Sequence, residues 1–475
     1  MKREIIFVSL LSAMLLSACA TKNETTFTQV SSTMEKPWSE GVVEASEGAT
    51  KLAYTISLDD KGQKVDGFGA CFNELGWTSL SLLSPEERTE VLTELFAPNT
   101  GANFNICRMP VAANDFSTDW YSYNETEGDF EMKNFSIEHD KSTLIPFIHS
   151  ALEQNPDIKI WASPWCPPSW LKHNKHYASK YNADTHAPEY HNGLAKDKEG
   201  FEGTDMFIVE PEYLDAYALY FEKFIKAYDK EGIDIFAVMP QNEFNSAQVF
   251  PSCCWTAPSL GKFIGEYLGP KMEALGVDVM IGTVERADDG LVTTMLNQKD
   301  CSKYVKGIGF QWAGKGAVGA IHQKYPDMKL YQTEQECGNG KNDWAGTTHS
   351  WDLLKHYFDN GVSTYLYWNI SLMEGGISRW GWAQNSLVVV DPTTKSYRFT
   401  PEYYLMKHIS HYVKPDAQYV ATPEGFEGLV FQNPEGEIVI LYMEKNGENT
   451  SLELTVNQTT YTLNVAANSI NTFIL

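Results

Sequence analysis

Residues 235–243 read Ile-Phe-Ala-Val-Met-Pro-Gln-Asn-Glu, a short apolar run that ends abruptly in a proline, two amides and a carboxyl. The run has the length and composition of a buried strand. Polar side chains that follow such a strand directly lie at its carboxyl end. This stretch therefore predicts that Asn242 and Glu243 stand side by side at one edge of a sheet.

Further apolar runs of this kind alternate with amphipathic stretches between about residues 65 and 390, as in repeated βα units. The predicted strands are Val65–Phe72, Phe104–Arg108, Lys159–Ser163, Ile235–Met239, Val277–Gly282, Gly307–Gln311, Leu330–Thr333 and Thr364–Trp368. Eight strands with long connections predict an α/β chain folded as a (β/α)8 TIM barrel, which places its chemistry at the carboxyl ends of its strands.

The last part of the chain has a different pattern, in which β-prone runs are separated by Gly-containing turns, and it predicts an antiparallel β module. The predicted strands here are Leu429–Gln432, Glu437–Met443, Ser451–Val456, Thr459–Leu463 and Ile470–Ile474, and Lys51–Leu58 is expected to join them. We therefore expect a polar tether at 20–50, an N-terminal strand segment at 51–64, the barrel at 65–400 and a C-terminal β domain at 401–475.

Composition limits the class of ligand. The 475 residues contain 37 Lys and Arg against 62 Asp and Glu, a net charge of −25. Such a surface repels the phosphate backbone of nucleic acids, which are therefore not expected as partners. The 13 Trp and 24 Tyr residues suit a neutral, hydroxyl-rich ligand whose apolar faces lie on aromatic rings.

The first 19 residues have the pattern of a bacterial export signal. Met1–Glu4 carries two basic residues, and the apolar run from Ile5 to Leu16 is too short to remain as a membrane-spanning helix. Leu16-Ser17-Ala18-Cys19 resembles a lipoprotein cleavage box, so Cys19 is expected to carry the lipid; the alternative is an ordinary signal peptide. We expect a protein of the bacterial cell envelope, held to the membrane by this anchor only.

Seven cysteines remain after Cys19, an odd number without any Cys-x-x-Cys spacing. We expect most of them to be buried free thiols, which behave as small hydrophobic side chains. They are Cys71, Cys107, Cys166, Cys253, Cys254, Cys301 and Cys337.

Carboxyl groups follow two of the predicted strands. Glu243 follows the fourth, and Glu334 and Glu336 follow the seventh. Two carboxylates on opposite walls of a barrel mouth are what glycoside hydrolysis requires, one to protonate the leaving oxygen and one to stabilise or trap the oxocarbenium-like centre. Spacing leaves open which residue of the seventh strand acts, since side chains two apart in a strand point to one face.

Aromatic side chains gather at the same strand ends. Trp161 lies inside a strand and is expected in the core, whereas Trp165 and Trp382 lie among Pro, Gly and Ser and are expected to bind ligand. Arg108 and the nearby Asp115 are explained equally well by a structural ion pair or by a functional role.

Two other patterns suggest different chemistry. Gly314–Gly319 matches G-x-G-x-x-G after a strand, but it occurs once, and we expect no nicotinamide cofactor. His173, His176, His186 and His191 lack metal-binding spacing, so a loop that lines a cleft is favoured over a metal site. No metal or other cofactor is expected.

Taken together, the motifs resemble glycoside hydrolase family 30, which includes glucosylceramidases and β-1,6-glucanases. The resemblance runs from about residue 51 to the C-terminus and implies a (β/α)8 barrel, a β-sandwich side domain built from both chain ends, and a retaining mechanism. The matching motifs are Gly67-Phe68-Gly69, Arg108-Met109-Pro110, Asp115-Phe116-Ser117, Ala162-Ser163-Pro164-Trp165, Ser169-Trp170-Leu171-Lys172, Asn242-Glu243, Thr333-Glu334, Trp368-Asn369 and Glu374-Gly375-Gly376.

The resemblance implies that Glu243 is the general acid/base and Glu334 the nucleophile. It further implies that Asn242 holds the sugar 2-hydroxyl and that Arg108 supports the nucleophile electrostatically. The other side chains expected to bind the sugar are Asp115, Trp165, Trp312, Trp368 and Trp382.

One position departs from the glucosylceramidase pattern, because Ala313 stands where those enzymes have a tyrosine able to bond the nucleophile. We expect another donor to take that role. The segments Thr333–Gly338 and Gly376–Trp382 look more like the β-1,6-glucanase branch. The expected function is therefore hydrolysis of β-1,6-glucan. The alternatives are a glucosylceramidase-like or oligosaccharide β-glucosidase and, more remotely, a surface glycan-binding protein without catalysis.

Overall fold

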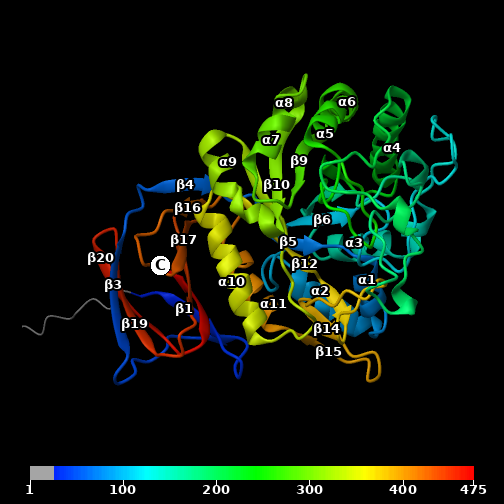
Figure 1. Ribbon diagram of the computed structural model, residues 1–475. Helices are drawn as coiled ribbons and strands as arrows, with labels where there is room; N and C mark the ends of the chain where they lie inside the picture. Colours follow the sequence, from blue (N-terminus) through cyan, green and yellow to red (C-terminus); the bar gives the residue numbers. More distant parts are fainter. Residues whose placement is uncertain (1–25) are drawn as a thin grey trace, which may run out of the picture.

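The computed structural model describes residues 26–475, so the predicted signal segment and Cys19 lie outside the described residues. A closed eight-stranded barrel with helices around it occupies one side of the molecule, and a β-rich domain lies beside it (Figure 1). Blue strands from the start of the chain and red strands from its end lie together in this second domain. The predicted fold class is confirmed.

The barrel strands are all parallel and close in the order β10-β11-β12-β5-β6-β7-β8-β9. Each of the eight predicted strands is confirmed, with ends displaced by no more than two residues. Their bounds are β5 (Gly67–Cys71), β6 (Ile106–Pro110), β7 (Lys159–Ser163), β8 (Ile235–Val238), β9 (Asp278–Val284), β10 (Val305–Gln311), β11 (Lys329–Glu334) and β12 (Thr364–Asn369).

The helices cover the barrel with one apolar face each. In α4 (Pro211–Lys230), proline occupies the first turn, where its missing N–H costs nothing, and Tyr217, Phe221, Phe224 and Tyr228 recur at helical spacing and are buried. The other α-helices are α1 (Glu74–Leu80), α2 (Pro85–Phe96), α3 (Leu144–Leu152), α5 (Ala257–Phe263), α6 (Gly269–Leu275), α7 (Asp289–Leu296), α8 (Cys301–Tyr304), α9 (Val318–Lys324), α10 (Trp344–Asp359) and α11 (Pro401–Ser410).

Short helical turns and a small sheet complete the barrel domain. The turns are η1 (Glu138–Ser142), η2 (Ser169–Leu171), η3 (Pro188–Tyr190), η4 (Lys196–Lys198), η5 (Ile264–Leu268) and η6 (Trp312–Gly316), and the sheet contains β13 (Ser371–Met373), β14 (Val388–Val390) and β15 (Tyr397–Phe399). Within residues 26–475, every helix is too short or too polar to span a lipid bilayer.

The side domain consists of two sheets packed over a common apolar core. One sheet has the order β2-β1-β21-β18-β17-β16-β4 and the other β20-β19-β3. Neighbouring strands are antiparallel except β3 and β19, which come from opposite ends of the chain and pair in parallel. The strands are β1 (Thr28–Ser32), β2 (Ser39–Glu40), β3 (Thr50–Ile56), β4 (Lys61–Lys64), β16 (Gln418–Val420), β17 (Gly428–Gln432), β18 (Ile438–Glu444), β19 (Thr450–Val456), β20 (Thr459–Val465) and β21 (Ser469–Ile474).

The predicted tether at 20–50 is wrong where the structure describes it. Strand β1 pairs with β21 along its whole length, Val30 is buried, and the Gln29 side chain donates to the Asn464 carbonyl (2.8 Å). A polar, Ser/Thr-rich segment forms a strand here because β21 offers it an unpaired edge. The predicted boundary between barrel and C-terminal β domain at residue 400 lies just before α11. This helix contacts both β5 of the barrel and β21 of the side domain, so it does not belong to the side domain alone.

His408 of α11 ties these parts together. It is fully buried, its Nε2 lies 2.8 Å from Ser32 Oγ of β1, and its Nδ1 lies 2.8 Å from Thr472 Oγ1 of β21. Burial, reinforced by the neighbouring charge of Lys407, lowers the pKa of His408 from 6.5 to about 3. The imidazole is therefore neutral in the folded protein, with each ring nitrogen beside a hydroxyl.

This arrangement predicts an acid-sensitive contribution to stability. Between pH 6.5 and 3 the unfolded chain binds a proton at His408 that the folded chain does not, so the free energy of unfolding falls as the pH decreases. Urea denaturation of wild type and His408→Gln is expected to show that the wild-type advantage at pH 7 shrinks by roughly 1 kcal/mol per pH unit below 6.5. A gap that stays constant from pH 7 to 5 would contradict a neutral, buried His408.

Candidate active site

A pocket of about 270 Å³ lies among side chains that follow the carboxyl ends of the barrel strands. Because the ring of strands brings these ends to one mouth, residues far apart in sequence line one small space. The lining residues are Asp115, Trp165, Glu243, Gln248, Phe250, Glu285, Trp312, Ala313, Glu334, Trp382 and Gln384.

The two predicted catalytic carboxyls face each other across one amide. Gln311, the last residue of β10, directs its Nε2 at Glu243 Oε1 (3.1 Å) and at Glu334 Oε2 (3.2 Å). Two contacts of this length from one nitrogen keep these oxygens closer together than the roughly 6.5–9.5 Å that separates the carboxyls of inverting glycosidases. Only 8% of Glu243 and 5% of Glu334 is exposed.

Glu334 is held by strong donors. Arg108 Nη1 donates to its Oε2 (3.0 Å), and Trp312 Nε1 donates to its Oε1 (3.1 Å). Arg108 is fully buried, and its guanidinium carbon lies 4.3 Å from the ring centroid of Trp165, so its charge is stabilised by an aromatic face as well as by hydrogen bonds. Arg108 thus forms its ion pair with the predicted nucleophile, and no ion pair between Arg108 and Asp115 is present among residues 26–475.

Glu243 receives only neutral donors. Gln311 and Gln248 donate to its carboxyl group, at 3.1 and 3.3 Å, and its own backbone N–H donates to Thr283 Oγ1 (2.8 Å). Its φ of 45° is in the left-handed region, a conformation that costs energy for a residue with a Cβ and that clusters at functional sites.

These surroundings separate the protonation behaviour of the two groups. Burial raises the pKa of both carboxyls, that of Glu334 to about 7, and the Arg108 guanidinium opposes the rise at both but is hydrogen-bonded only to Glu334. A cation bonded to Glu334 favours its ionised form, so of the two groups Glu243 is the better holder of a proton. This is the asymmetry that a nucleophile and a general acid need.

Glu336 is the other carboxyl of the seventh strand that spacing left open as the acting residue, and it lies outside the pocket. Its Oε1 accepts from Lys315 Nζ (2.5 Å) and its Oε2 lies 3.1 Å from His349 Nε2. Strand β11 ends at Glu334, so the alternation that would place both carboxyls on one face no longer applies two residues later. The hydrogen bond from His349, followed by that from Lys315, lowers the pKa of Glu336.

The predicted sugar-binding residues separate into two groups. Asp115, Trp165, Trp312 and Trp382 line the pocket, and Asp115 Oδ1 is buried without a hydrogen-bond partner among residues 26–475. Asn242 is buried and is not one of the lining residues; its Oδ1 accepts from Arg108 (2.7 Å), Gln311 and Thr283, and within the described chain its Nδ2 makes no hydrogen bond.

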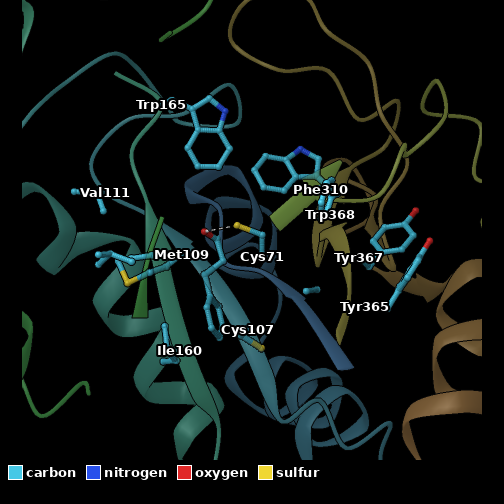
Figure 2. Close-up of a cluster of buried hydrophobic side chains, with 14 of the residues drawn as sticks. Cys71, Cys107, Met109, Val111, Ile160, Trp165, Phe310, Tyr365, Tyr367 and Trp368 are labelled. Carbon is cyan, nitrogen blue, oxygen red and sulfur yellow. Dashed lines mark hydrogen bonds between the residues drawn. The ribbon is translucent and has the colours of Figure 1, made fainter. Parts of the chain in front are cut away.

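Trp368 is placed differently from the prediction. It is fully buried and is not one of the residues that line the pocket. Its ring stacks against that of Trp165, with centroids 5.3 Å apart (Figure 2). The expectation that Trp368 contacts the sugar face is therefore corrected: its side chain supports the ring that does line the pocket. Trp161 is buried among strand residues, as predicted.

Sequence reasoning missed Gln311 and Glu285. Gln311 ends the sixth barrel strand and Glu285 follows the fifth, so the rule that singled out Glu243 and Glu334 would also have found them if applied to every strand end. The donor expected in place of the missing tyrosine is supplied by Gln311, Arg108 and Trp312 together.

The bridging amide predicts a measurable change in pH dependence. Gln311→Leu removes a donor that lowers the pKa of Glu243, so that pKa rises and the alkaline limb of the profile of kcat/KM moves to higher pH. Loss of hydrogen bonds to charged groups is also expected to reduce kcat by roughly 10- to 100-fold. An unchanged limb would show that Gln311 does not act on the acid/base.

The seven cysteines of residues 26–475 are all free and buried, as predicted. Within the same residues, no three His, Cys, Asp or Glu side chains come close enough together to hold a metal ion. Gly314 is required for packing, since a Cβ there would lie 2.0 Å from the Val284 carbonyl oxygen.

Two family models match this chain, and several known proteins resemble it. The model of the glycosyl hydrolase family 30 TIM-barrel domain matches residues 65–413, and that of the family 30 beta sandwich domain matches residues 416–473. The chain is 29% identical over 446 residues to the lysosomal acid glucosylceramidase of Mus musculus, covering 87% of this chain and 81% of the relative.

Two further proteins resemble it over most of their length. The endo-1,6-beta-D-glucanase neg1 of Aspergillus fumigatus is 24% identical over 461 residues, which is 91% of this chain and 90% of the relative. The solved structure of the endo-beta1,6-glucanase BT3312 superposes with a TM-score of 0.79 and 23% identity, covering 94% of this chain and 99% of that one, and it shares the fold.

Proposed function

The chain belongs to glycosyl hydrolase family 30 and is therefore a glycosidase, and from this premise we propose that it hydrolyses β-glucosidic bonds with retention, acting on β-1,6-glucan. The observation that carries the retaining mechanism is the single amide of Gln311 between Glu243 and Glu334. A gap this short leaves no room for a water molecule between nucleophile and sugar, so the carboxylate itself attacks.

The reaction then proceeds in two steps. Ionised Glu334 attacks the anomeric carbon while Glu243 gives its proton to the glycosidic oxygen, the carbon–oxygen bond breaks, and a glucosyl ester of Glu334 forms. Glu243, now ionised, takes a proton from water, and the resulting hydroxide displaces Glu334 from the sugar and regenerates both groups. Arg108 stabilises the Glu334 carboxylate before attack and after release.

Unpaired polar atoms at the pocket are suited to a glucosyl unit. Asp115 Oδ1 is buried without a partner, an expensive state that a sugar hydroxyl relieves by donating to it. The Nδ2 of Asn242 is positioned to donate to the 2-hydroxyl because its Oδ1 is already held by Arg108. Trp165 and Trp382 offer aromatic faces to the apolar faces of the ring.

Two observations support β-1,6-glucan as the substrate. Two proteins whose names state activity on β-1,6-glucan match 91% and 94% of this chain, over 90% and 99% of their own length. The segments Thr333–Gly338 and Gly376–Trp382 resemble that branch more than the glucosylceramidases. The second candidate is a glucosylceramidase-like or oligosaccharide β-glucosidase, favoured by the 29% identity to the mouse enzyme.

Product analysis tests the proposal. The purified protein is incubated with linear β-1,6-glucan, β-1,3-glucan, xylan and glucosylceramide, and the first-formed anomer is followed by NMR. Release of β-1,6-linked sugars as the β anomer is expected. Glucose from the lipid or small glucosides alone would favour the second candidate, and an α anomer would exclude retention. Inactivity on all four would favour a glycan-binding protein.

We also propose that Cys19 carries a lipid that holds the protein in the bacterial cell envelope. The support is the sequence alone: two basic residues, a short apolar run and the Leu16-Ser17-Ala18-Cys19 box. Radiolabelled palmitate fed to an expressing bacterium is expected to label the wild type and not Cys19→Ala. Labelling of the variant, or no label on either protein, would contradict the anchor.

A further inference from the structure

A fourth carboxyl, Glu285, lines the same pocket as Asp115, Glu243 and Glu334, and it has no place in the two-step reaction. Only 5% of this residue is exposed, and its Oε1 is buried without a hydrogen-bond partner in the described chain. Its Oε2 pairs with Arg286. A buried oxygen that stays unpaired at the wall of a pocket needs an explanation, and a hydroxyl of a bound molecule supplies one.

Arg286 connects Glu285 to the rim. Its Nε and Nη2 donate to the two carboxylate oxygens of Glu202, at 2.9 and 3.2 Å, and this fork fixes the plane of the guanidinium. Glu285, Arg286 and Glu202 thus form a row of paired charges. The exposed fraction of the side chain increases along this row, from 7% for Glu285 to 33% for Arg286 and 52% for Glu202. The row therefore runs from the buried wall of the pocket outward to solvent.

The order of strands around the barrel shows which side of the pocket this row occupies. Glu243 follows β8 and Glu334 ends β11, so the two carboxyls divide the mouth into two arcs. The wider arc, β12-β5-β6-β7, contains the buried Arg108 and Asp115. The narrower arc, β9-β10, contains Glu285 and Ala313, whose small side chain leaves space.

The two arcs suit the two halves of a cleaved glycosidic bond, the glucosyl unit and the leaving group. The sugar that becomes the glucosyl ester must be held in a fixed position against Glu334, and the buried Asp115 and the Arg108 that bonds Glu334 lie in the wider arc. The leaving group needs a place beside the proton donor Glu243 that is open to solvent. Glu285 lines the same pocket as Glu243, and burial together with the charge of Glu243 raises the pKa of Glu285 to about 8.

We propose that Glu285, Arg286 and Glu202 form the binding site for the leaving group, and that it takes a hydroxylated sugar rather than an apolar lipid chain. The proposal rests on the proposed function. A sugar supplies hydroxyls to the unpaired Glu285 oxygen and to the half-exposed Arg286. A hydrocarbon chain in the same place would remove water from the charged and partly exposed Arg286 and Glu202 and return no hydrogen bond, which is unfavourable.

The test compares substrates that differ only in the leaving group. A β-1,6-linked glucose disaccharide fills the proposed site, whereas β-glucosyl fluoride leaves it empty and needs no proton donor. For Glu285→Leu, kcat/KM for the disaccharide is expected to fall at least tenfold more than kcat/KM for the fluoride. The ratio of kcat/KM for the disaccharide to kcat/KM for glucosylceramide is expected to fall in this variant. Equal losses on disaccharide and fluoride, or no loss on either, would overturn the proposal.

Two more variants keep the test independent of folding. Glu202→Gln changes a half-exposed side chain. It is expected to lower kcat/KM for the disaccharide, relative to that for the fluoride, by about threefold, because Arg286 loses part of its bidentate hydrogen bonding. Glu374→Gln breaks a comparable carboxylate–arginine pair with Arg398 elsewhere and serves as the matched control, with no change in the ratio of the two substrates.

A pH profile separates this role from an effect on Glu243. If Glu285 only tuned the acid/base, Glu285→Leu would shift the alkaline limb for the disaccharide and leave KM unchanged, which would overturn the proposal. A raised KM at every pH supports it. Wild-type protein that turns over neither substrate would show that the proposed function itself is wrong, an outcome distinct from a failed variant comparison.

Discussion

Glu334→Gln is expected to abolish hydrolysis of activated aryl glucosides and of β-1,6-glucan alike, by at least ~10³-fold in kcat. An amide of the same size cannot attack the anomeric carbon, and no leaving group, however good, compensates for a missing nucleophile. The measurement is kcat and KM for 2,4-dinitrophenyl β-glucoside and for the polymer, on protein whose thermal unfolding matches the wild type.

Glu336→Gln is the matched control for this prediction. It removes the same functional group two residues away, where Glu336 pairs with Lys315 and His349 outside the pocket. Activity is expected to stay within about twofold of wild type, since exposed ion pairs contribute little. The reverse result, an active Glu334→Gln and an inactive Glu336→Gln, would move the nucleophile by two residues.

Glu243→Gln is expected to separate the two substrates. Hydrolysis of the polymer requires a proton on the leaving sugar, so its kcat/KM should fall by roughly 10²- to 10⁴-fold. The dinitrophenolate leaves without a proton, so formation of the glucosyl ester from the aryl substrate should be nearly unaffected. Pre-steady-state release of dinitrophenol measures this step directly and is expected to show a burst, because the second step now lacks its base.

The contradicting outcome for Glu243 is an equal fall on both substrates with no burst. The control is Gln248→Ala, which removes a weaker contact with the Glu243 carboxyl at 3.3 Å and is expected to reduce both activities by only a few-fold. A pH profile of wild type should fall on the alkaline side as Glu243 loses its proton and on the acid side as Glu334 gains one.

The barrel strands were predictable because each is defined locally. An apolar run followed by polar residues, as in 235–243, predicts both the strand and what stands at its end. The same rule located Glu243 and Glu334. Once eight such runs were counted, the convergence of their carboxyl ends followed from the geometry of the barrel.

The N-terminal strand was not predictable in this way. Nothing in the composition of residues 28–32 indicates a strand, and β1 exists because β21, more than 430 residues later, presents an edge to pair with. The corrected place of Trp368 has a similar origin, because only packing shows that Trp165 covers it.

The barrel, the β module and the chemical class of the site follow from the amino-acid sequence, because periodicity and strand-end residues depend on near neighbours in the chain. Three features follow from the folded arrangement alone: Glu334 rather than Glu336 enters the pocket, Gln311 bridges the two carboxyls, and Glu285 lies in the narrow arc. These depend on where each strand ends and on which strands adjoin when the ring closes, and that is set by contacts between distant segments.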